Sequence, residues 1–148
     1  MASVRTLLDA EIYALIKADD PLWISIGGTA SGGGTGNLYP FTAPTGAPTP
    51  YLTYSFGSTA IFEAFKKRSP VGVEMPFHFD IFSDAAGPYE AEGIQDKLFT
   101  MIEDDDFVIT LTGYKPFHLR RGSDTQDYEK DTHYYHISNS YMGIIVPT

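Results

Sequence analysis

Residues 73–82 read VEMPFHFDIF, a run in which apolar and polar side chains alternate. Val, Met, Phe, Phe and Ile occupy one set of alternate positions, and Glu, Pro, His and Asp occupy the other. Because successive side chains of a strand point to opposite faces, this pattern predicts a β-strand with one face in the core. Pro76 lacks a backbone donor, which favours an edge or a bulge of the sheet.

One helix is expected before this strand in the sequence and another after it. After a turn at 84–88, apolar residues recur at helical spacing, and this stripe predicts a helix that packs on the sheet: Ala91, Ile94, Leu98, Met101 and Ile102. A first helix is expected to start after Ser3, a residue suited to the N-cap, and to end before Pro21. Its apolar stripe consists of Val4, Leu7, Leu8, Ile12, Leu15 and Ile16.

Further strands are expected at 51–56, 107–112, 115–121 and 132–146. Bulky residues point to both sides of the last one, so we expect a helix layer on one side and a neighbouring subunit on part of the other. The fold class is therefore α+β, a mostly antiparallel β-sheet packed against two main α-helices. One domain is expected over residues 1–148.

Loops are expected near 27–36, 57–72 and 122–131. The glycine-rich run 27–36 predicts a mobile surface loop, because burial cannot repay the entropy of ordering it. It lacks the Gly-Lys-Ser/Thr ending of a phosphate-binding loop. Pro40, Pro44, Pro48 and Pro50 exclude a helix from the next stretch and predict an extended, rigid connector.

Composition narrows the function classes. The 148 residues carry a formal net charge of −9, which disfavours binding driven by nucleic-acid phosphates. The absence of cysteine excludes disulfides, thiolate metal sites and a cysteine nucleophile. Charged residues interrupt the first eighteen positions, so neither a signal peptide nor a membrane anchor is expected there.

No catalytic, cofactor or metal site is predicted. His133 and His136 are expected on opposite faces of the last strand, with no acidic partner placed to complete a metal site. His78 and His118 are each expected on strands among aromatic residues, and the sequence carries no Gly-x-Ser-x-Gly nucleophile motif.

Two charged segments are candidate surfaces. A candidate interface with a second subunit or ring consists of Phe62, Phe65, Lys66, Lys67 and Arg68, which combine aromatic anchors with basic charge. A basic loop with no partner is an equally open interpretation. A candidate acidic surface consists of Glu103, Asp104, Asp105 and Asp106, whose spacing does not match a calcium-binding EF-hand loop. A solvated turn is the simpler interpretation of that run.

Several short motifs resemble the tail terminator, or tail completion, proteins of long-tailed bacteriophages. They are Ile12–Ile16, Tyr39-Pro40, Ala43-Pro44-x-Gly46, Pro50-Tyr51, Phe77–Phe82 and Tyr89-Glu90-Ala91, followed by an aromatic closing strand. The loops 27–36 and 122–131 depart from the shorter members of that family, so their surfaces cannot be inferred from it.

The resemblance implies a subunit of a hexameric ring in the virion that caps the tail tube and joins it to the head. It implies no catalysis and no cofactor. The implied partners are copies of itself, the tail tube protein and a neck connector protein, with DNA passing through the lumen without sequence readout and with no membrane involved. Assembly is expected in the host cytoplasm. A neck stopper protein, or a small ligand-binding or hydrolase α+β domain, is the alternative.

Overall fold

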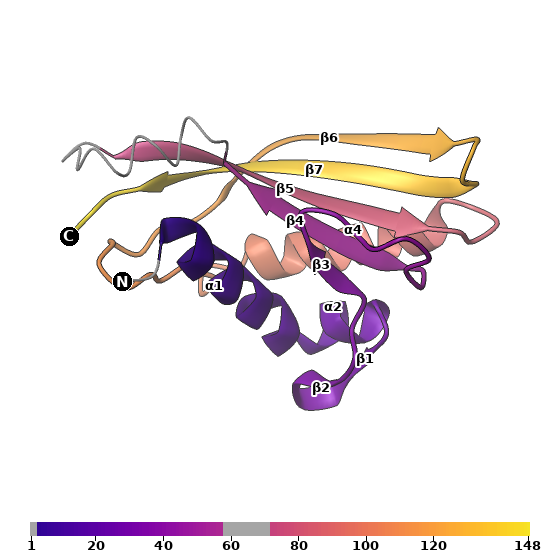
Figure 1. The fold of residues 1–148 in the computed structure, drawn as a ribbon, viewed down its shortest axis with the longest axis horizontal. Helices are drawn as coiled ribbons and strands as arrows, with labels where there is room; N and C mark the ends of the chain where they lie inside the picture. The colour runs from indigo at the N-terminus through magenta and orange to yellow at the C-terminus, as the bar shows by residue number, and fades with distance from the viewer. Residues whose placement is uncertain (1–2, 58–71) are drawn as a thin grey trace.

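The computed structural model describes residues 3–57 and 72–148 (Figure 1). A five-stranded sheet has the order β3-β4-β5-β7-β6, and the helices lie on one side of it. The strands are β3 Leu38–Pro40, β4 Tyr51–Phe56, β5 Val73–Ser83, β6 Arg120–Glu129 and β7 Tyr134–Ile145. All neighbouring strands are antiparallel except β3 and β4. The predicted α+β class is confirmed.

Helix α1, Val4–Ala18, begins where the sequence predicts, because the Ser3 side chain accepts a hydrogen bond from the Thr6 amide. Its buried stripe is Val4, Leu8, Ile12 and Ile16. The hydroxyl of Tyr54 on β4 donates to the Asp9 carboxylate, which ties α1 to the sheet. Burial, together with this hydrogen bond, raises the pKa of Tyr54.

Helix α4, Tyr89–Ile102, buries all five of its predicted apolar positions. Strand β5 buries Met75, Phe77, Phe79 and Ile81 on the helix side, as its alternation predicts. We call this side the inner face and the opposite side the outer face. The inner face therefore forms the core together with α1 and α4.

Pro76 lies in an internal strand, since β5 is flanked by β4 and β7. The expectation of an edge strand is therefore wrong. Pro76 instead stands where the pairing with β4 ends: the Gly57 amide donates to the Pro76 carbonyl at 3.0 Å, while Pro76 has no amide to return the bond.

The glycine run is packed rather than loose. After the short helix α2, Asp20–Ser25, it forms β1 Gly28–Thr29, a 3-10 turn at Ala30–Gly32 and β2 Gly33–Gly34. The indole of Trp23, 1% exposed, donates to the Gly33 carbonyl at 2.8 Å. A Cβ on Gly28 would lie 2.2 Å from that indole. Burial of Trp23 offsets the entropy cost of ordering this run, which was expected to be a mobile loop.

The proline connector contains no helix, as expected, but it is not an extended arm. It turns back through Ala47, whose amide donates to the Pro44 carbonyl at 3.1 Å, and the Thr49–Pro50 peptide is cis. This return places β3 parallel to β4, with Leu38 opposite Leu52.

Two other expectations need correction. The segment 122–131 was expected to be a loop, but residues 122–129 belong to β6, which pairs with β7. The stretches 107–112 and 115–121 are not two strands, because only the isolated bridge Ile109↔Phe117 joins them and Arg120 already belongs to β6. Their apolar residues nevertheless close the core: Phe107, Ile109, Leu111, Phe117 and Leu119 are buried.

Candidate interaction surfaces

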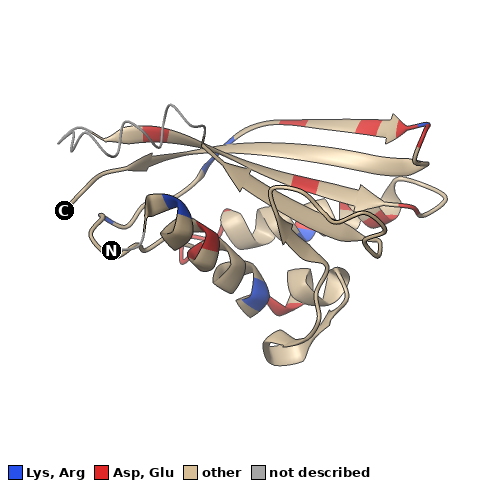
Figure 2. Ribbon diagram, viewed as in Figure 1, with Lys and Arg blue, Asp and Glu red and all other residues tan. Residues whose placement is uncertain are grey.

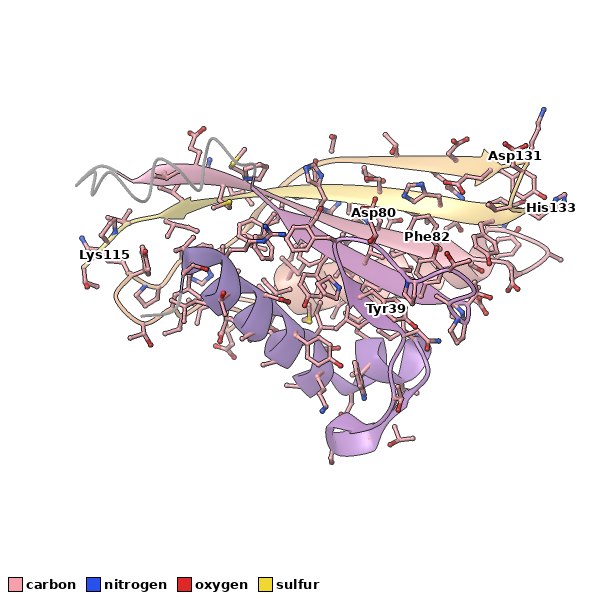
Figure 3. The ribbon with its side chains drawn as sticks, in the orientation of Figure 1. Tyr39, Asp80, Phe82, Lys115, Asp131 and His133 are labelled. Atoms are coloured by element: carbon pink, nitrogen blue, oxygen red, sulfur yellow. The ribbon has the colours of Figure 1, made fainter. Side chains whose placement is uncertain are left out.

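The outer face carries an aromatic row of Tyr51, Phe82 and His136. Tyr51 on β4 is directly opposite Phe82 on β5, and Phe82 is opposite His136 on β7. The rings stack with centroids 4.7 Å and 4.2 Å apart and with interplanar angles of 23° and 15°. Tyr134 adds an edge contact to Tyr51. The row spans three strands on the side of the sheet that the described helices leave open (Figure 1), with Phe82 at its centre (Figure 3).

Two carboxylates hold the His136 ring. Nε2 lies 3.0 Å from Asp80 Oδ1, and Nδ1 lies 3.3 Å from Glu129 Oε1. The hydrogen bond to Asp80 raises the pKa of His136, although burial opposes the rise. Burial pushes the pKa of Asp80 upward, but hydrogen bonds with His136 and Ser138 lower it overall. The arrangement therefore favours a charged cluster that joins β5, β6 and β7.

His136 has two acidic neighbours that the sequence pattern of its own strand does not reveal. They come from positions 80 and 129 on the two neighbouring strands. His133 is not on the strand but in the turn before it, with φ of 59°, and its Nδ1 lies 3.2 Å from the Tyr128 hydroxyl. Within 3–57 and 72–148, no group of three or more His, Cys, Asp or Glu side chains is arranged so that it could hold a metal ion.

The other two histidines are separate. His78 is exposed on the outer face of β5, whereas His118 lies outside any strand with Nδ1 2.8 Å from the Phe107 carbonyl. The expectation of a strand position is thus confirmed for His78 only. Neither histidine is brought to a nucleophile by any hydrogen bond that the structure shows.

The acidic run 103–106 follows α4 and is exposed. Glu103 is bound by Arg121 of β6 through two hydrogen bonds of 2.7 and 2.6 Å, and the Arg121 guanidinium stacks 3.7 Å above the Phe99 ring. The Asp104 carboxylate accepts from the Asp106 amide at 2.8 Å. One acid therefore joins α4 to the edge strand, and another stabilises the turn.

The run also borders a groove between α4 and the junction of α1 and α2. One hollow of about 290 Å³ has an apolar lining that includes Met101 and Phe107, and its acids are Asp19, Asp104 and Asp106. A second hollow, of about 360 Å³, adds Asp96 and shares Asp19 with the first. We call the two together the acidic groove.

The candidate interface Phe62, Phe65, Lys66, Lys67 and Arg68 lies outside the described residues. Its role stays a prediction.

The edge strand β6 and its contacts were not predicted from the sequence. Nine of its ten residues are exposed, so no apolar alternation marks it as a strand. The Asp124 carboxylate accepts from Gln95 of α4, which also donates to the buried Asn139 at 2.8 Å. Acidic residues recur along β6 and in the middle of β5 (Figure 2). One signal that could have indicated β6 is the length of β7, because the backbone N–H and C=O groups along its second edge require hydrogen-bond partners.

The fold has a counterpart among solved structures. A chain from the "Virion of native gene transfer agent (GTA) particle" matches with a TM-score of 0.68. The match covers 99% of each chain. Sequence identity is 17%, so the likeness shows a shared fold. No protein-family model and no curated protein sequence matches. None of the helices in the described part has the length and apolar character that crossing a membrane requires.

Proposed function

We propose that this chain is a structural virion protein that caps the phage tail tube. Copies assemble as a ring, by our reading a hexamer, which ends tail polymerisation and provides the face that joins the head. The observation that carries the proposal is the fold shared over 99% of both chains with a protein of the gene transfer agent virion. The tail-terminator motifs in the sequence support it independently.

The outer face supports a role in assembly rather than in chemistry. It presents stacked rings and charged groups on an open sheet surface, and the two hollows of the acidic groove are lined by no histidine. Catalytic sites are usually concave, with convergent polar groups. We therefore favour a structural role over a small hydrolase or ligand-binding domain.

The net charge of −9 suits a ring through which DNA passes. A basic lumen would hold the strand by phosphate contacts, whereas an acidic protein makes few of them. The proposed partners are further copies of this chain, the tail tube protein and a neck connector protein, and the proposed location is the tail or neck of the virion.

The test measures the mass of the purified protein by light scattering, alone and mixed with the tail tube protein, followed by electron microscopy. We expect rings, or caps at one end of each tube, and tubes that stop growing. A stable monomer that never binds tubes would overturn the proposal. Binding to a head connector but not to tubes would favour a neck stopper protein instead.

A further inference from the structure

The acidic groove has the chemistry of a receptor for a basic, aromatic peptide segment. Its lining combines apolar surface from Leu15, Met101 and Phe107 with four aspartates, Asp19, Asp96, Asp104 and Asp106. Lys97 is the one base among the residues that line it. An apolar floor bordered by carboxylates disfavours anions and suits a segment that brings aromatic side chains and positive charge together.

The aspartates are not neutralised within the described residues. Asp19 accepts from the Leu22 amide and Asp104 from the Asp106 amide, but no aspartate of the groove forms an ion pair there. Like charges gathered on one surface repel one another, so an incoming cation would be favoured.

The chain itself contains a segment of this kind. Its only run of three basic residues, Lys66, Lys67 and Arg68, holds three of its ten basic charges. The run directly follows Phe65 and begins four positions after Phe62. The fourteen residues 58–71 lie between the described residues Gly57 and Gly72. By covalent geometry alone, fourteen residues joined at both ends extend outward by at most about 24 Å, which is enough to contact an adjacent molecule.

We propose that the acidic groove of one copy receives the segment 58–71 of the next copy in the assembly. An aromatic side chain of the segment lies on the apolar floor, and its three basic residues face the aspartates. Segment and groove are different surfaces, so the contact is head-to-tail, and such contacts close into rings when the rotation permits. The inference rests on the proposed function for the existence of the ring, but the contact between copies is tested separately.

Site-directed disulfides provide the test, because the chain has no cysteine of its own. Arg68→Cys in one copy is mixed with Asp106→Cys in a copy that carries a mass tag, and mild oxidation follows, with and without the tail tube protein. The matched control replaces Asp106→Cys by Asp131→Cys, another exposed aspartate, in the β6–β7 turn. We expect the mixed disulfide to form at least about tenfold more with position 106 than with position 131.

Charge reversal is the second arm. The triple variant Lys66→Glu, Lys67→Glu, Arg68→Glu should weaken self-association at least about tenfold, and Asp96→Lys with Asp106→Lys in the same chain should restore it. Both aspartates are exposed, so the fold should survive the change. Rescue by the paired change cannot come from misfolding.

Equal cross-linking at positions 106 and 131 in both conditions, or no rescue, would overturn the inference. A disulfide that forms only within single molecules of the double-cysteine variant would overturn it as well. If tubes are capped but position 106 does not cross-link, only the groove assignment fails. If the cross-link forms but tubes are never capped, only the proposed function fails.

Discussion

The two faces of the sheet are held in different ways. The inner face is a conventional core, in which Phe79, 1% exposed, meets Tyr141 edge-to-face and the helices cover both. No helix within 3–57 and 72–148 covers the outer face, whose contacts are the stacked row and the carboxylates around His136. Burial thus determines the fold, whereas the outer face adds ring stacking, charged contacts and a surface that the fold itself does not need.

The largest effect on stability is expected from a pair of single variants, each of which removes one aromatic ring from a different face of the sheet. Phe79→Ala should destabilise the protein by about 3 to 5 kcal/mol, because it leaves a cavity in the core. Phe82→Ala removes stacking against Tyr51 and His136 and should cost roughly 1 to 2 kcal/mol. Urea unfolding of the two variants at neutral pH measures both values. Equal losses would contradict the distinction between the faces.

A smaller effect is expected where the segment 107–119 closes the inner face. A Cβ on Gly143 would lie 2.8 Å from Phe117 Cε2, so Gly143→Ala should destabilise by about 1 to 3 kcal/mol. The control is Gly93→Ala in α4, where a Cβ meets nothing within 4 Å. That change should stabilise by up to about 1 kcal/mol, because alanine favours the helix. Thermal unfolding of both variants should show shifts of opposite sign.

The inner face could largely be predicted from the sequence. The apolar period of α1, α4 and β5 marks each element separately, because each buries one regular stripe against the same core. The prediction of a mobile loop at 27–36 was wrong because the order of this run depends on Trp23, a single side chain that fills the space beside Gly28 and Gly36. Local composition does not contain that contact.

The outer face and the edge strand could not be predicted in the same way. Tyr51, Phe82 and His136 meet only once the register of three strands is fixed, and nothing in the local sequence sets that register. Strand β6 has no apolar period, since both of its faces meet solvent. Its acid at position 129 reaches His136 through pairing with β7.

The smallest effect concerns the charge on His136. A raised pKa means that the folded state holds the proton more tightly, so the imidazolium stabilises the fold below about pH 6.5, the ordinary value. That stabilisation is lost as the pH rises through the folded-state value. The lowered pKa of Asp80 acts in the other direction, because its contribution is present above about pH 4 and is lost as the pH falls further.

The cluster should therefore contribute most between about pH 4 and pH 6.5. His136→Gln, which cannot be protonated, should reduce stability by under about 1 kcal/mol at pH 5.5 and by less at pH 8.5, since water partly screens the charges of these partly exposed groups. Urea unfolding of the wild type and the variant at both pH values gives the difference. Two further charged groups face the cluster: Asp127 is opposite His136 on β6, and His78, exposed on the same face of β5, helps to lower the pKa of Asp80. If the loss is the same at both pH values, the ring acts on the outer face by stacking on Phe82 alone.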